Sequence, residues 1–390
     1  MEVYFDNSAT TRVLDKVVAA MDQMMTENYG NPSARHIMGV RAENAVKQAA
    51  SQVAKTLKVK EKEILFTSGG SESNNMALIG TALANKRAGK HIIASNIEHP
   101  SIYNTLGFLE EMGFEVTYLR VDQKGHVDLE QLKQAVRPDT ILVSVMYVNN
   151  EVGAVEPVEE IGKIVHGANP GTVFHVDAIQ AYGKFQIRPK KQGIDLLSVS
   201  GHKLHGPKGI GFLYIDEHVK IRPIIYGGGQ QRGMRSGTEN VPGIVGMGVA
   251  AEEAYTNFEE KVGHLCALKD HMLERLKEVE GATPNSYPGR ESAPQVVSVS
   301  FSGVRSEVLL HALEDKGIYV SSGSACSSNH PDVSGTLKGI GVKPELLDST
   351  LRFSFGRFNT LEEVDYCIET LKELLPVLRR YQREIGRAHV

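Results

Sequence analysis

The sequence of 390 residues has few cysteines, no long apolar run and no strong excess of charge of either sign. Its three cysteines, Cys266, Cys326 and Cys367, are widely separated and odd in number, which fits a reducing compartment better than a disulfide framework. No two of them have zinc-ligand spacing.

No run approaches the roughly 18 apolar residues of a membrane span, and the first residues lack the basic and apolar regions of a signal peptide. The formal net charge of −4 does not favour nucleic acid as the main partner. We therefore expect a cytoplasmic protein with no direct nucleic-acid or membrane partner and no metal site of its own.

Seven short apolar or β-branched runs alternate with stretches long enough for helices. The runs span residues 64–66, 92–94, 116–119, 141–147, 173–176, 196–199 and 212–215. Stretches with helical character span residues 73–87, 101–112, 128–136 and 158–166. This alternation predicts an α/β fold with a mainly parallel seven-stranded sheet flanked by helices.

The character of the sequence changes beyond about residue 255. A charged amphipathic stretch at 258–279 predicts a long helix. A connector rich in glycine, proline and serine follows, and then a predicted strand at 296–301 and a helix at 306–316. These elements predict a smaller α+β domain. Cys266 and Cys367 have apolar neighbours, so we expect both in its core.

Polar residues suited to chemistry follow the predicted strands, at the sheet edge where ligands bind in open α/β folds. The first strand leads into residues 67–75, whose glycines and hydroxyls open a helix and can bind a phosphate. His99 follows the second strand, Asp177 the fifth and Lys203 the sixth. One edge of one sheet therefore receives a phosphate-binding segment, an imidazole, a carboxylate and an amine.

These groups match the needs of pyridoxal phosphate. Lys203 can form a Schiff base with its aldehyde, a buried Asp177 can keep its pyridine nitrogen protonated, and His99 can stack on the ring and move a proton. Each residue also has an ordinary alternative. Lys203 can be a solvated lysine in a turn, Asp177 the N-cap of a helix, and His99 a turn residue. Residues 68–71 can be a simple capping segment. These alternatives do not explain why all the groups follow strand ends.

Motifs along nearly the whole chain resemble those of a known family. They are YFDNSATT (4–11), GNPS (30–33), SGGSESN (68–74), NNEVG (149–153), SGHK (200–203), RSGTEN (235–240) and LRFSFGRF (351–358). With them the chain resembles the cysteine desulfurases of the class V aminotransferase group, which are fold-type I pyridoxal phosphate enzymes. The resemblance implies a large cofactor-binding domain of residues 13–255 and a small domain of residues 1–12 and 256–390.

The resemblance also implies roles for single residues. Lys203 would hold the cofactor covalently, Asp177 would face the pyridine nitrogen, and Gln180 would lie near the ring hydroxyl. Asn150 and Arg352 would orient the substrate carboxylate, because a guanidinium fork matches a carboxylate with two hydrogen bonds. The implied cofactor-binding set is Gly70, Ser71, His99, Asn150, Asp177, Gln180, Ser200, Gly201, His202, Lys203 and Thr238, the last from the other subunit of a homodimer.

Cys326 lies in a run of small and polar residues, 320–331, which predicts a loop. By itself the cysteine would more commonly be a buried structural one. The run matches the Ser-Gly-Ser-Ala-Cys motif of the desulfurases, in the branch with the longer catalytic loop. The resemblance implies that the Cys326 thiolate attacks the sulfur of L-cysteine and leaves a persulfide and L-alanine. The implied catalytic set is Cys326, Lys203 and His99.

Several alternatives stay open from the sequence. The sulfur acceptor would be an iron–sulfur scaffold, a tRNA-thiolation enzyme or another carrier. The one metal role left open is that of Cys326 as a cluster ligand shared with a scaffold. The basic segment 379–387 is either a solvated helix end or a docking site for an acidic acceptor. The other functions considered are a selenocysteine lyase, a class V aminotransferase and a catalytically silent binding protein. Two positions depart from the family pattern: Ser71 replaces a threonine, and Gln231 replaces a glutamate.

Overall fold

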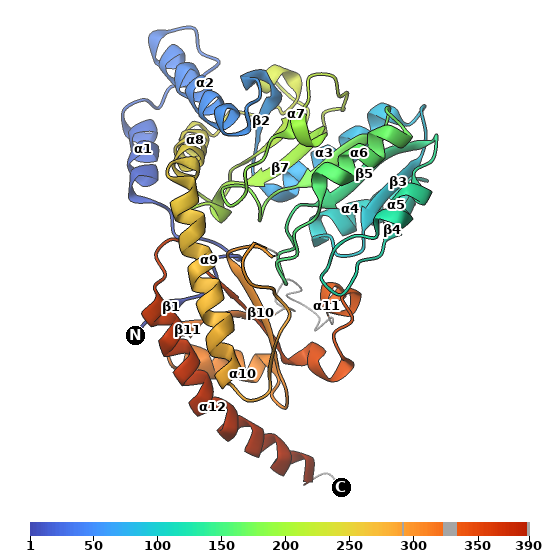
Figure 1. Ribbon diagram of the computed structural model, residues 1–390. Coiled ribbons are helices and arrows are strands. Elements are labelled where there is room, and N and C mark those ends of the chain that lie inside the picture. Colours follow the sequence, from blue (N-terminus) through green and yellow to red (C-terminus); the bar gives the residue numbers. More distant parts are fainter. Residues whose placement is uncertain (291, 323–333, 388–390) are drawn as a thin grey trace.

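The computed structural model describes residues 1–290, 292–322 and 334–387, with side chains described as far as residue 380. Cys326 therefore lies outside the described residues. Figure 1 shows a large sheet with its helices in the upper half of the molecule and a smaller sheet with the helices α9, α10 and α12 below it. None of the described helices is long and apolar enough to cross a membrane.

The larger sheet has seven strands in the order β2-β8-β7-β6-β5-β3-β4. Its strands are β2 (Ile64–Thr67), β3 (His91–Ser95), β4 (Glu115–Leu119), β5 (Thr140–Met146), β6 (Val173–Asp177), β7 (Leu196–Ser200) and β8 (Gly211–Ile215). Only β8 runs antiparallel to its two neighbours, and the other pairings are parallel. The predicted mainly parallel seven-stranded sheet is confirmed.

Helices cover both faces of this sheet because side chains alternate between the faces along each strand. Phe66, Val143 and Val199 pack into one core, together with α1, α2, α6 and α8. Their neighbours, such as Leu65 and Leu142, pack into a second core with α3 and α4. The helices that accompany the larger sheet are α1 (Asp15–Thr26), α2 (Ile37–Leu57), α3 (Gly70–Asn85), α4 (Pro100–Glu111), α5 (Leu129–Ala135), α6 (Val158–Ala168), α7 (Pro189–Gln192) and α8 (Val241–Tyr255).

A smaller sheet in the order β12-β13-β10-β9 and the parallel pair β1-β11 form the rest of the described structure. Their bounds are β1 (Val3–Tyr4), β9 (Ala282–Pro284), β10 (Val296–Phe301), β11 (Ile318–Tyr319), β12 (Ser321–Ser322) and β13 (Thr350–Ser354). The accompanying helices are α9 (Phe258–Arg275), α10 (Ser306–Glu314), α11 (Gly335–Gly339) and α12 (Leu361–Arg387). A separate core joins Phe5 from the N-terminal end to Phe301, Phe353 and Cys367. The predicted smaller α+β part is confirmed, whereas the boundaries at 12/13 and 255/256 stay a prediction.

Some local predictions need correction. The long helix predicted over 258–279 ends at Arg275 and continues as a 3₁₀ turn, and the connector after it begins with the short strand β9. Cys367 is buried as expected, but Cys266 is only half-buried. The N-cap alternative for Asp177 is wrong, because Asp177 is the last residue of β6 and a turn follows it.

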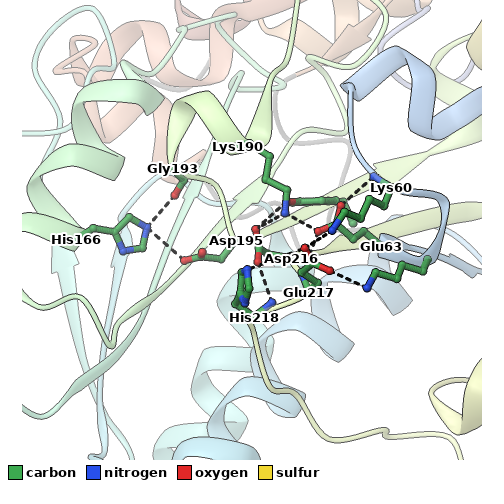
Figure 2. A network of polar contacts seen from close by, with 11 residues as sticks. Lys60, Glu63, His166, Lys190, Gly193, Asp195, Asp216, Glu217 and His218 are labelled. Atoms are coloured by element: carbon green, nitrogen blue, oxygen red, sulfur yellow. Dashed lines mark hydrogen bonds and ion pairs between the residues drawn. The ribbon is translucent and has the colours of Figure 1, made fainter.

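A network of charged side chains ties strands together at the edge of the larger sheet where the parallel strands begin (Figure 2). The Lys190 ammonium lies between Glu63, which precedes β2, and Asp216, which follows β8, with N–O distances of 2.5 and 2.7 Å. Asp195 precedes β7, accepts a hydrogen bond from the backbone of Phe174 on β6, and also pairs with His166 at 3.3 Å. These contacts stabilise the register of the strands, and the opposite edge is left for the cavity described next.

Candidate active site

A cavity of about 470 Å³ lies at the carboxyl ends of the parallel strands. Ten of the predicted site residues line it: Gly70, Ser71, His99, Asn150, Asp177, Gln180, Ser200, His202, Lys203 and Arg352. They come from the ends of β2, β3, β5, β6 and β7, and Arg352 comes from β13 of the smaller sheet. The topology therefore brings together the residues that the strand-end argument selected.

Asp177 supplies a carboxylate that is only 4% exposed. Its Oδ2 accepts a hydrogen bond from Asn74 Nδ2 at 2.9 Å and its Oδ1 accepts one from the backbone of Ile179 at 3.0 Å. Burial raises the pKa of Asp177, while the neighbouring His99 and these hydrogen bonds oppose the rise. A cation brought against this carboxylate would favour its charged form.

His99 both begins α4 and lines the cavity. Its Nδ1 accepts a hydrogen bond from the backbone N–H of Ser101 at 3.1 Å, so the neutral ring carries its proton on Nε2. Burial lowers the pKa of His99, which keeps the imidazole neutral near pH 7, although Asp177 opposes the shift. His99 thus fills the N-cap position that its place before Pro100 allows and also presents a hydrogen-bond donor.

The start of α3 forms one end of the cavity and opens into an adjoining hollow of about 380 Å³. Gly69, Gly70, Ser71, Ser200 and His202 line that hollow. Backbone N–H groups at the first turn of a helix have no partner within the helix, so they are suited to bind an anion. The backbone also passes close to β8 here, since a Cβ on Gly211 would lie 2.9 Å from the Cα of Gly69. The hollow has the chemistry of a phosphate site.

Lys203 ends a 3₁₀ turn, Gly201–Lys203, that follows β7 directly. Its ammonium donates hydrogen bonds to the backbone carbonyls of Ser8 and Ala9, the latter at 2.7 Å. The side chain of Lys184 donates to the carbonyl of Lys203 itself at 2.6 Å. Burial lowers the pKa of Lys184 to about 7. Lys203 is therefore a fixed residue in the cavity wall and not a solvated lysine in a turn.

Arg352 lies at the other end of the cavity, with its side chain 10% exposed. Its Nη1 donates to the carbonyl of Asn150 at 2.8 Å, and its Nη2 donates to Asp6 Oδ1 at 3.1 Å. Its Nε is buried and has no hydrogen-bond partner among the described residues. This guanidinium is suited to bind a carboxylate that enters the cavity.

Two predicted residues, Gly201 and Thr238, are not among the described residues that line the cavity, and a third lies outside the described part of the chain. Gly201 is buried behind it, where an added Cβ would lie 3.0 Å from Ile210 and 3.2 Å from the sulfur of Met247. Thr238 is exposed on the surface of the single chain and is absent from the cavity wall as far as the structure describes it. Cys326 is outside the described residues, so its position relative to the cavity stays a prediction.

Sequence reasoning missed Asp6, Ser8 and Ala9, which contact Arg352 and Lys203. Ser8 and Ala9 act through backbone carbonyls, which leave no signature in a sequence. It also missed Asn74, which donates to Asp177. The one available signal was the place of these residues inside the motifs at 4–11 and 68–74.

Comparisons with known proteins agree with this geometry. Residues 3–367 match the family described as Aminotransferase class-V. The protein named Cysteine desulfurase IscS from Methanosarcina thermophila is 47% identical over 377 residues, which cover 97% of this chain and 93% of that protein. The chain belongs to the cysteine desulfurases of the class V aminotransferase family. Cysteine desulfurase IscS 1 from Archaeoglobus fulgidus is 41% identical and covers 96% of this chain and 97% of its own length.

Solved structures show the same relationship. A structure described as a NifS-like protein has a TM-score of 0.92 and 42% identity, and the match covers 97% of this chain and 100% of that one. Another, described as SspA in complex with cysteine, has a TM-score of 0.81 and 36% identity over 92% of this chain and 100% of that one. The fold of this cysteine desulfurase family member is therefore that of the NifS-like structures.

The departure from the family pattern at Gln231 has a structural explanation. Gln231 Oε1 accepts a hydrogen bond from the backbone N–H of Phe66, and Nε2 donates one to the carbonyl of Phe66, both at 2.7 Å. Phe66 is on β2, which is an edge strand of the larger sheet. The amide therefore pairs with the open edge as another strand would, which a glutamate at this position could not do because a carboxylate has no donor.

Proposed function

We propose that the protein is a pyridoxal-phosphate-dependent cysteine desulfurase that converts L-cysteine to L-alanine and collects the sulfur as a persulfide on Cys326. The observation that carries the proposal is the convergence of Lys203, Asp177 and His99 with the phosphate-type hollow in one cavity that Arg352 closes at the other end. The family membership supports the same reaction.

The residues present fit the cofactor. Asp177 is a buried carboxylate whose hydrogen bonds come from uncharged donors in the described structure, so a protonated ring nitrogen would complete its surroundings. The amides of Gly70 and Ser71, with the side chains of Ser200 and His202, would hold the phosphate. Lys203 would form the covalent bond to the aldehyde. When bound, the cofactor supplies an electron sink that weakens bonds at the substrate α-carbon.

The chain's own residues would bind, orient and protonate. To react, the Lys203 side chain would give up its hydrogen bonds to the carbonyls of Ser8 and Ala9. The hydrogen bond from Lys184 to the Lys203 carbonyl would keep the Lys203 backbone in place. His99 would lie against the cofactor ring and could donate through Nε2–H, since its Nδ1 is engaged by Ser101. Gln180 lines the cavity and its Nε2 donates to the Ser8 carbonyl at 3.0 Å, and we propose that it would interact with the ring hydroxyl. Arg352 and Asn150 hold the substrate carboxylate at the far end.

The sulfur step belongs to Cys326. Its thiolate attacks the substrate sulfur, a sulfur–sulfur bond forms as the carbon–sulfur bond breaks, and the substrate carbon takes up a proton to give alanine. A thiolate is needed because the thiol is a poor nucleophile. We further propose a homodimer in which Thr238 reaches the phosphate of the partner site, which is in keeping with its exposure on the single chain.

The acceptor would be an iron–sulfur scaffold or a tRNA-thiolation enzyme in the cytoplasm. The basic segment after residue 378 would offer a docking site, but Arg379 has a structural role, since it donates to the carbonyls of Ser302 and Glu280 at 2.9 and 2.7 Å. A deletion that tests docking should therefore begin after Arg380. Transfer of labelled sulfur to either acceptor should then fall, and unchanged transfer would rule out docking by this segment.

The reaction is tested by measuring alanine from L-cysteine and the protein persulfide. The wild type should form both when no thiol reductant is present to remove the persulfide sulfur, Cys326→Ala should form neither, and Lys203→Ala should lose the cofactor's long-wavelength absorbance as well. Cys266→Ala is the matched control, because Cys266 is half-buried on α9 and is not among the cavity residues. Desulfuration by Cys326→Ala at the wild-type rate would contradict the proposal.

A further inference from the structure

The strongest feature of the cavity without an assigned role is Asp6, an acidic residue in contact with Arg352. Asp6 lines the cavity, and its side chain is 22% exposed. The backbone on either side of it is held by Ser354, since Phe5 accepts a hydrogen bond from the Ser354 N–H at 2.7 Å and Asn7 donates to the Ser354 carbonyl at 3.2 Å. Asp6 is therefore fixed to β13, the strand that also carries Arg352.

The charge of Arg352 is already balanced before any ligand arrives. Asp6 Oδ1 accepts from Arg352 Nη2 at 3.1 Å, which is the geometry of an ion pair. Burial raises the pKa of Asp6, while the nearby charges of Arg352 and Lys203 oppose the rise and favour the ionised form. Asn150 takes one further donor of the guanidinium through its carbonyl. A guanidinium has five N–H donors, so donors are left over for an incoming carboxylate. The positive charge, however, is shared with Asp6.

We propose that Asp6 is the built-in counter-ion of Arg352 and makes the cavity select ligands that carry both a carboxylate and an ammonium group. The proposal rests on the proposed function only in taking Arg352 as the carboxylate receptor. A simple carboxylate that binds Arg352 must approach the Asp6 charge, which opposes it. An amino acid also brings an ammonium group next to its carboxylate, and this group compensates Asp6. Asp6 thus favours the zwitterion over anions that match only half of the pair.

The experiment uses three probes that cannot react with an aldehyde. Acetate carries only the carboxylate, tetramethylammonium carries only the cation, and glycine betaine joins the two. Dissociation constants are measured by ligand-observed NMR titration on the full-length protein loaded with pyridoxal phosphate. The variant Asp6→Asn removes the charge but keeps an oxygen that can accept from Arg352. Asp348→Asn is the matched control, because Asp348 pairs with Arg305 on the surface.

In Asp6→Asn, acetate should bind at least tenfold tighter, which corresponds to about 1.4 kcal/mol, and tetramethylammonium at least tenfold weaker. Betaine should change less than either probe, and Asp348→Asn should change none of them. A smaller gain for acetate, or a loss, would overturn the proposal, because a residue that merely positions Arg352 would weaken acetate binding when it is altered.

A second variant keeps the proposal testable if Asp6→Asn does not fold. In Arg352→Gln the Asp6 charge loses its partner, so tetramethylammonium should bind at least tenfold tighter than in the wild type, and unchanged binding would overturn the proposal. None of these titrations needs turnover. A protein that shows the expected binding pattern but forms no alanine from L-cysteine would refute the proposed function and leave the role of Asp6 standing.

Discussion

The close approach of β8 to the phosphate-type hollow gives a prediction whose size can be worked from the structure. A Cβ added to Gly211 would lie 2.4 Å from the carbonyl oxygen of Val199 and 2.9 Å from the Cα of Gly69. Ordinary contact begins at 3.4 Å, so the contact with the Val199 oxygen would be about 1 Å too short and the contact with the Gly69 Cα about 0.5 Å too short. Neither atom belongs to a flexible side chain, and Val199 is held within the sheet. The Gly69 side is therefore expected to give way.

Gly211→Ala should accordingly weaken both the fold and the cofactor site. Overpacking of this kind costs about 1–3 kcal/mol, which corresponds to a fall in Tm of a few degrees in a chain of this size. A shift of about 0.5 Å at Gly69 would be passed to the adjoining amides of Gly70 and Ser71 and should raise the dissociation constant of pyridoxal phosphate about tenfold. The measurements are thermal unfolding and an absorbance titration of the cofactor-free protein.

The control is Gly263→Ala on α9, where an added Cβ meets nothing within 4 Å. Alanine is a better helix residue than glycine, so this variant should gain about 0.5–1 kcal/mol and bind the cofactor normally. If Gly211→Ala binds the cofactor as tightly as Gly263→Ala does, the backbone around Gly69 is not as constrained as the structure indicates, and the reasoning is refuted.

Three further predictions concern stability. Gln231→Glu places a carboxylate against the carbonyl of Phe66, so hydrogen–deuterium exchange in the peptide that contains β2 should be faster than in Gln231→Ala, and slower exchange would contradict the pairing. Burial raises the pKa of Glu98 to about 8, so the folded state loses stability as the pH rises from about 4.5 to about 8. The difference in Tm between Glu98→Gln and the wild type should therefore grow in favour of the variant from pH 5 to pH 8. A difference that stays constant with pH would contradict this prediction. Lys269 is fully buried and donates to the carbonyls of Gly289 and Ser292 at 2.6 and 3.0 Å, so Lys269→Met should cost about 3–5 kcal/mol of unfolding free energy with the cofactor affinity unchanged, and a loss below about 1 kcal/mol would refute its structural role.

The sequence predicts those parts of the site that depend on local signals. Each strand of the larger sheet is a short apolar run, and the polar residues after the runs meet because parallel strands end at one edge. That reasoning places His99, Asp177 and Lys203 in one cavity without any knowledge of distant contacts. The local alternative for Asp177, a helix N-cap, is wrong because a turn follows the strand; an aspartate that accepts a nearby backbone N–H can either cap a helix or close a turn.

Contacts between distant parts of the chain could not be predicted in this way. Asp6 and Arg352 are separated by 346 residues, and nothing in either segment specifies the other. The role of Gln231 depends on the backbone of an edge strand, which is open to any donor and acceptor that reaches it. The Asp6–Arg352 contact depends on how distant segments pack, and the Gln231 contact depends on where the folded backbone leaves its polar groups. Neither can be read from a single sequence.

The two ends of the cavity are supported by different cores. Lys203 and Asp177 follow adjacent strands of the larger sheet, so their relative position is set by the pairing of β6 with β7. Arg352 is on β13 of the smaller sheet, next to Phe353 in the separate core. The segment from Asp6 to Ala9 contacts both ends, through Arg352 and through Lys203. A change in the packing of the smaller sheet is therefore transmitted to Arg352 directly and to Lys203 through residues 6–9.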